Sequence, residues 1–201
     1  LGPDGQRMSK SRGNVVVPES VYEKYGVDVT RLYLMFMGPF EATMAWNEKT
    51  LAGVRRFIER YRQMVKRAIE GSKQNKLKHA SNKELGMIIN KTINKVEKDL
   101  ENFGFNTAIA KLMEMVNEIG VEAKTAGEEE VGQLIKLIAP FAPYTAEDLW
   151  QEAKEDTWLE SVHLSSWPKI EAGGWEEEEI CVPVAVNGKV RSQLKVSKED
   201  L

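Results

Sequence analysis

The sequence is poor in the residues that build disulfides and metal sites. Its 201 residues include one cysteine, Cys181, and two histidines, His79 and His163. A single thiol excludes an internal disulfide and any metal site with several cysteine ligands, and two histidines add too few ligands for zinc. We therefore expect no protein-bound metal, and so few thiols are typical of a cytoplasmic protein.

Long apolar runs are missing as well. No stretch approaches the roughly 20 consecutive apolar residues that a membrane-spanning helix needs, so we expect no association with a membrane. The opening residues, Leu1 to Gly5, contain no initiator Met and no apolar signal segment. We expect the chain to belong to a larger protein, either as a piece of it or as a separate natural subunit. With 42% hydrophobic and 29% charged residues, it has the composition of a globular protein with a core.

Charge is unevenly distributed, although the net charge is only −3. The segment from Lys49 to Lys78 contains ten Lys and Arg residues against two Glu, whereas Glu147 to Glu179 contains eleven acidic residues against two Lys. Such separation favours a polyanionic partner on the basic side. Two solvated faces of opposite sign are the alternative.

Apolar spacing predicts a mainly α protein, built as a helical bundle. Helices are expected over residues 18–25, 28–37, 47–70, 82–100, 106–119, 128–139 and 145–150, with caps expected at Asp28, Ser81 and Asn106. The longest helix carries one apolar stripe for the core: Leu51, Val54, Ile58, Tyr61, Val65 and Ala68. Its cations lie off that stripe, on the side expected to face solvent: Arg55, Arg56, Arg62, Lys66 and Arg67.

A C-terminal β-hairpin is predicted where the helical period ends. Asn187-Gly188 is a strong two-residue turn signal between apolar runs that begin at Ile180 and end at Val196. Such a turn pairs Val186 with Lys189, Val184 with Arg191 and Val182 with Gln193. This register mixes Val and basic residues on one face, so the register stays open.

The chemistry is concentrated in one loop, Arg7-Met8-Ser9-Lys10-Ser11-Arg12-Gly13-Asn14. It combines three cations, two hydroxyls and several backbone amides, the groups that bind the phosphate oxygens of a triphosphate. The spacing of a P-loop is absent. A basic surface loop with no ligand is the alternative.

This loop resembles the KMSKS signature of class I aminoacyl-tRNA synthetases, with Arg7 where Lys is usual. The Asp-x-x-Arg-Leu segment at Asp28 is similar to the one that follows the signature in the leucine, isoleucine and valine branch. Two later stretches resemble the leucyl enzymes, Phe105 to Ala110 and Val186 to Arg191, whereas Ala139 to Trp150 resembles a stretch shared more widely across that branch. Departures from the pattern are Arg7, Ala45 and Tyr144.

The resemblance implies a leucine–tRNA ligase, which activates leucine with ATP and transfers it to tRNA(Leu). The residues implied to bind ATP are Arg7, Met8, Ser9, Lys10 and Ser11, with Mg²⁺ expected to accompany ATP. Lys10 is implied to be catalytic, because it matches the second Lys of the signature. The family's His-x-Gly-His element and a leucine pocket are missing, so this chain alone is expected to be inactive.

The resemblance also implies an organisation in three parts. Residues 1–40 would end the catalytic domain, residues 41–155 would form an anticodon-binding-type helical bundle, and residues 156–201 would form an acidic linker and the start of a β-containing domain. The cations implied to contact tRNA are Arg55, Arg56, Arg62, Lys66, Arg67, Lys189 and Arg191. A valyl or isoleucyl enzyme, or a tRNA-binding module without catalysis, remains as an alternative.

Overall fold

The structure, a computed structural model, describes residues 1–201 except 40, 75–81, 155–157, 171–178, 187–188 and 198–201. Seven α-helices are described: α1 (Pro18–Tyr25), α2 (Val27–Phe36), α3 (Glu48–Gln74), α4 (Lys83–Glu101), α5 (Phe105–Ile119), α6 (Glu128–Ile138) and α7 (Pro143–Ala153). Short 3₁₀ turns lie at η1 (Lys10–Arg12), η2 (Gly120–Thr125) and η3 (Val162–Leu164), and two strands at β1 (Glu179–Val186) and β2 (Lys189–Ser197). In this part of the chain, no helix is both long and apolar enough to cross a bilayer.

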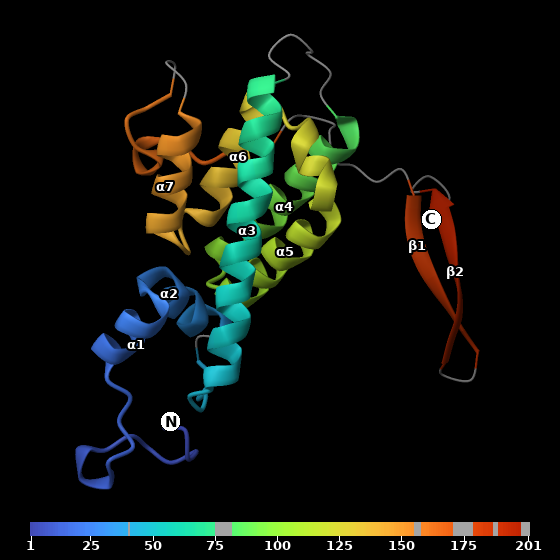
Figure 1. The fold of residues 1–201 in the computed structure, drawn as a ribbon. Coiled ribbons are helices and arrows are strands. Elements are labelled where there is room, and N and C mark those ends of the chain that lie inside the picture. Colours follow the sequence, from blue (N-terminus) through green and yellow to red (C-terminus); the bar gives the residue numbers. More distant parts are fainter. Residues whose placement is uncertain (40, 75–81, 155–157, 171–178, 187–188, 198–201) are drawn as a thin grey trace.

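The helices assemble around α3, the longest of them (Figure 1). Helix α3 contacts α2, α5, α6, α7 and η2, so it is the central element of the bundle. The predicted apolar stripe is confirmed, since these residues are all buried: Leu51, Val54, Ile58, Tyr61, Val65 and Ala68. The mainly helical fold class is likewise confirmed.

Tyr61 shows how the core accommodates a polar atom. Its ring is completely buried, and its hydroxyl donates a hydrogen bond of 2.7 Å to the carbonyl oxygen of Leu134 in α6. Burial raises the pKa of this hydroxyl far above its usual value, because the phenolate would lose its hydration. The residue therefore joins α3 to α6 as a neutral donor.

Several helix starts differ from the prediction. Asn82, rather than Ser81, is the residue before α4, and its Oδ1 accepts hydrogen bonds from the backbone nitrogens of Glu84 and Leu85. Ser81 itself lies outside the described residues. Helix α5 starts at Phe105, one residue before the cap predicted at Asn106, and follows Gly104. Helix α7 starts at Pro143, because proline fits the first turn, where no N–H donor is needed.

Asp28 was predicted to cap its own helix, and this prediction is wrong. Gly26 precedes α2, whereas the Asp28 carboxylate is buried against the first turn of α7. It accepts hydrogen bonds from the backbone nitrogens of Thr145 (2.6 Å) and Tyr144 (3.4 Å). Arg31, one turn further along α2, donates to the carbonyl oxygen of Pro140. Helix α2 is therefore attached to the start of α7 by two polar residues.

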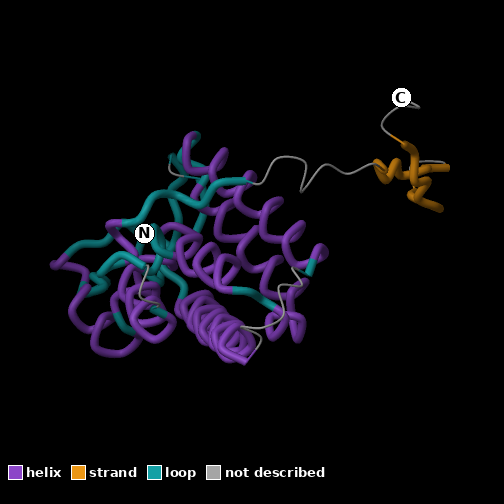
Figure 2. Tube along the Cα trace, turned by 90° about the horizontal axis from the view of Figure 1, so that it is seen from above, coloured by secondary structure: helices purple, strands orange, loops and turns teal. Residues whose placement is uncertain are grey.

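The two strands pair as an antiparallel hairpin, which lies apart from the helical body (Figures 1 and 2). The register agrees with the sequence at Val186 opposite Lys189, but Val184 lies opposite Ser192 and Val182 opposite Leu194. The predicted pairing of Val184 with Arg191 and of Val182 with Gln193 is therefore wrong. An irregularity between Val184 and Ala185 shifts the register by one residue, which places apolar residue types opposite each other.

Gly71 marks a close approach between α3 and η2. The residue is buried in α3, and a Cβ atom added to it would overlap the carbonyl oxygen of Lys124. Gly53, in the same helix, has nothing within 4 Å of an added Cβ. Only the first of these two helical glycines is required by packing.

We expect Gly71→Ala to lower the free energy of unfolding by about 1–3 kcal/mol, the usual cost of overpacking. Gly53→Ala is the matched control, and it should stabilise the chain by about 0.5–1 kcal/mol because alanine favours a helix. Denaturant unfolding followed by circular dichroism measures both variants. A Gly71→Ala variant as stable as Gly53→Ala would contradict this packing.

We also expect Asp28→Ala to destabilise α7, because two backbone donors in its first turn lose their acceptor. The loss of a capping carboxylate costs about 0.5–2 kcal/mol. Hydrogen exchange measured by NMR should show faster exchange at the amides of Tyr144 and Thr145, while amides in the middle of α4 change little. Unchanged exchange at these two amides would show that Asp28 does not cap α7.

Candidate functional site

The N-terminal loop presents its cations to solvent. Arg7, Lys10 and Arg12 are exposed, whereas Met8 and Ser9 are half-buried. Around η1 the backbone nitrogen of Arg12 donates to the carbonyl oxygen of Ser9. The chain then reverses direction at Gly13, whose backbone has the left-handed conformation. The loop therefore has a compact backbone with positive side chains on its outside.

Polar side chains hold this backbone together. Ser9 and Ser11 join their hydroxyls at 2.8 Å. The Asn14 amide bonds to the backbone nitrogen of Ser9 and to the Asp4 carboxylate. Hydrogen bonds from the Gln6 backbone nitrogen and from Asn14 lower the pKa of Asp4, because they stabilise its charged form. Sequence reasoning did not assign roles to Asp4 and Asn14.

The loop is tied to the start of α3. The backbone nitrogen of Trp46 donates to the carbonyl oxygen of Leu1, and the Trp46 ring packs edge-on against Tyr33 with centroids 4.7 Å apart. The Tyr33 hydroxyl accepts a hydrogen bond of 2.7 Å from the backbone nitrogen of Asn47. Asn47 in turn caps α3 by accepting from the Lys49 and Thr50 backbone nitrogens. These contacts place the loop at the N-terminal end of the central helix.

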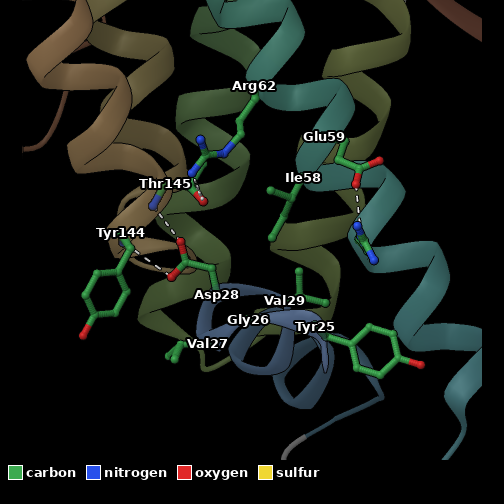
Figure 3. Close-up of a pocket in the computed structure, with 11 residues that line it drawn as sticks. Tyr25, Gly26, Val27, Asp28, Val29, Ile58, Glu59, Arg62, Tyr144 and Thr145 are labelled. Carbon is green, nitrogen blue, oxygen red and sulfur yellow. Dashed lines mark hydrogen bonds and ion pairs between the residues drawn. The ribbon is translucent and has the colours of Figure 1, made fainter. Parts of the chain in front are cut away.

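A cleft of about 370 Å³ lies where α1 and α2 meet α3 and α7 (Figure 3). Its lining includes the apolar side chains Val29 and Ile58 and four charged residues, Asp28, Arg55, Glu59 and Arg62. The two carboxylates balance the two guanidinium groups, and each is already in a hydrogen bond or ion pair. The formal charges of the residues that line this cleft therefore sum to zero.

Three of the five cations predicted on α3 are ion-paired. Arg55 Nε lies 3.0 Å from Glu59 Oε1 in the same helix. Lys66 Nζ lies 2.9 Å from Glu152 Oε2 of α7. Arg62 Nη2 lies 2.8 Å from Asp148 Oδ2 of α7 and also donates to Thr145 Oγ1. Arg62 lies off the apolar stripe as predicted, but it is half-buried because its guanidinium group contacts α7.

Arg56 and Arg67 are exposed, and neither has an ion pair within the described ranges of the chain. They share one face of α3, and Arg60 lies on it between them, one helical turn after Arg56. Arg60 Nη2 donates to Asn117 Oδ1 of α5 at 2.6 Å, so this face borders α5 and not the acidic α7. We call Arg56, Arg60 and Arg67 the basic face. Arg60 was missed, although its spacing from Arg56 was readable in the sequence.

The remaining predicted residues lie on the hairpin. Lys189 begins β2 opposite Val186, and Arg191 is the extra residue at the register shift. Over the ranges that the structure describes, no group of three or more His, Cys, Asp or Glu residues could hold a metal ion.

The comparisons with known proteins fit this arrangement of loop and bundle. Residues 82–200 match the model of the anticodon-binding domain of tRNA ligase, and residues 1–47 match that of the class I tRNA synthetases (I, L, M and V). A crystal structure of a ternary complex, Agrobacterium radiobacter K84 agnB2 LeuRS-tRNA-LeuAMS, superposes on the whole chain with a TM-score of 0.80 and 28% identity. The chain spans 28% of the length of that synthetase. It belongs to the class I aminoacyl-tRNA synthetases, a ligase family, and carries their anticodon-binding domain.

Proposed function

We propose that this chain serves a leucine–tRNA ligase, supplying the ATP-binding loop and part of the tRNA-binding surface. The observation that carries the proposal is the structural likeness to a leucyl enzyme, which extends over the loop and the bundle together. A module that only binds tRNA has no use for an ordered loop with an exposed Lys10. A valyl or isoleucyl enzyme is the second candidate, because the family model of residues 1–47 includes both.

In the proposed reaction, a carboxylate oxygen of leucine attacks the α-phosphorus of ATP. The bond from that phosphorus to the bridging oxygen breaks, and pyrophosphate leaves with the electron pair and the negative charge. Lys10 would stabilise this charge as it develops, with Arg7 as a second cation. Met8, Ser9 and Ser11 would contribute backbone amides or hydroxyls to the phosphates. Mg²⁺ would enter with ATP and neutralise phosphate charge.

Amino-acid-dependent exchange of pyrophosphate into ATP tests the substrate. It is to be measured on the whole synthetase polypeptide with leucine, isoleucine and valine in parallel. We expect leucine to be preferred over both. A preference for valine or isoleucine would replace the leucyl assignment by the second candidate.

We expect Lys10→Ala to slow adenylate formation by about 10²–10³-fold, because a preformed positive charge at the leaving group is lost. Leucine binding should change little, since the charge acts mainly in the transition state. Pre-steady-state quench-flow separates the two effects. Lys10→Arg should recover part of the rate, and Lys24→Ala, an exposed lysine on α1, is the control. A rate for Lys10→Ala within a few-fold of wild type would remove Lys10 from the mechanism.

The RNA-binding surface of the bundle is proposed to centre on the basic face of α3. The anionic backbone of tRNA attracts exposed cations, and contacts to phosphates position the RNA without reading its bases. Arg62 and Lys66 already pair with carboxylates of α7, so they contribute less than the sequence alone implied. Arg55, Lys189 and Arg191 are also proposed to contact tRNA, each with a smaller contribution to the affinity.

We expect the double substitution Arg56→Gln/Arg67→Gln to weaken tRNA binding and flatten its salt dependence. Each lost phosphate contact should reduce the log–log slope by about 0.7–0.9, because fewer counterions are released. Stability should change by no more than about 0.5 kcal/mol, as is usual for exposed positions. Filter binding at several salt concentrations gives the slope.

Arg55→Gln is the matched control for this experiment, because Arg55 is an exposed arginine on the same helix but is paired with Glu59. It should change the slope less than a single substitution at Arg56 or at Arg67 does. If affinity and slope are the same in the double variant and in wild type, the basic face does not contact tRNA.

A further inference from the structure

One side chain, Asn14, closes the N-terminal loop. We propose that Asn14, together with Asp4, is a positioning residue that holds this loop in the shape in which Lys10 can meet the phosphates of ATP. The inference rests on the proposed function, and it adds two residues that act through the loop rather than on the substrate.

The Asn14 amide uses both of its ends. Its Oδ1 accepts a hydrogen bond of 2.8 Å from the backbone nitrogen of Ser9. Its Nδ2 donates to both oxygens of Asp4, at 3.1 and 3.0 Å, and to the carbonyl oxygen of Arg7 at 3.3 Å. The residue thus contacts the loop ten, seven and five positions earlier in the chain. It draws the two ends of the loop together and leaves the tip between them.

Only an amide of this length can make these contacts at once. Aspartate would keep the acceptor for Ser9 but lose both donors, and it would place a second carboxylate against Asp4. Serine and alanine are too short to reach both partners. The chemistry therefore requires asparagine at position 14 as long as position 4 carries a carboxylate.

The packing around Gly2 is a second, independent observation that the Asp4 and Asn14 side chains are held close to the backbone. The residue is buried, and a Cβ atom added to it would lie 2.9 Å from Asp4 Oδ1 and 3.1 Å from Asn14 Nδ2. A side chain at position 2 would push these two groups apart. The backbone thus comes near the Asp4–Asn14 pair at a point where only glycine fits.

The pair also leaves the loop's charge available. The Asp4 carboxylate is occupied by Asn14 and by the backbone nitrogen of Gln6. Lys10 is exposed and has no ion pair among the described residues. The loop therefore orders its backbone with an acid and an amide, while its lysine stays free for a phosphate.

The first test is Asn14→Asp in the whole synthetase polypeptide. We expect the rate of adenylate formation to fall by about 10–100-fold, since small misplacements of a catalytic group have effects of this size. The KM for leucine should stay within about twofold, because the lost interaction acts on the transition state. Val15→Ala, the next residue along, is the control and should behave as wild type.

The second test exchanges the two groups. In Asp4→Asn/Asn14→Asp, the new amide at position 4 can donate to the new carboxylate at position 14, which still accepts from Ser9. We expect this variant to regain at least about tenfold of the lost rate, as coupled neighbours do in double-mutant cycles. Asn14→Asp alone should remain slow.

Lys10→Ala, measured in the same assay, separates the positioning role of Asn14 from the proposed role of Lys10. If Lys10→Ala is slow but Asn14→Asp is within about threefold of wild type, the positioning role is wrong while the proposed function stands. A slow Asn14→Asp that the exchange fails to restore also overturns the pair. If Lys10→Ala has no effect, Lys10 has no part in the proposed mechanism, and the inference fails with it, whereas pyrophosphate exchange tests the leucyl assignment separately.

Discussion

The contact between the Asp28 carboxylate and the first turn of α7 joins α2, which follows the N-terminal loop and α1, to the helical bundle. Two backbone N–H groups at a helix start need an acceptor, and a buried carboxylate satisfies both while the positive end of the helix stabilises its charge. Leu32, one turn further along α2, is completely buried in the core of the bundle. The segment that follows the loop is therefore part of the bundle's own core.

This attachment gives the loop a defined place relative to α3. Tyr33 lies next to Leu32 and contacts both Trp46 and Asn47, the residues that lead into α3. Lys10 and the basic face consequently belong to one continuous structure. Under the proposed function, this arrangement would hold the tRNA-binding face and the ATP-binding loop in a fixed geometry relative to each other.

The acidic residues of α7 have a structural role that the composition of the chain does not reveal. Carboxylates of α7 pair with Arg62 and Lys66, so the two charge clusters seen in the sequence partly neutralise each other. In the view of Figure 1, α7 and α5 flank α3 on opposite sides. The side towards α7 is balanced, whereas Arg56 and Arg67 keep their charge exposed. The exposed positive charge of α3 therefore lies on the side that borders α5.

The sequence alone determined the helices, the buried stripe of α3 and the loop signature, because these depend on residues a few positions apart. Tertiary structure decided the acceptor role of Asp28, which lies 117 residues from Thr145, and the pairing of Arg62. It also decided the hairpin register, where one extra residue changes every later pair. Local rules identify groups able to cap or pair, but several partners compete for each group. Packing selects among them by bringing distant segments within hydrogen-bond distance.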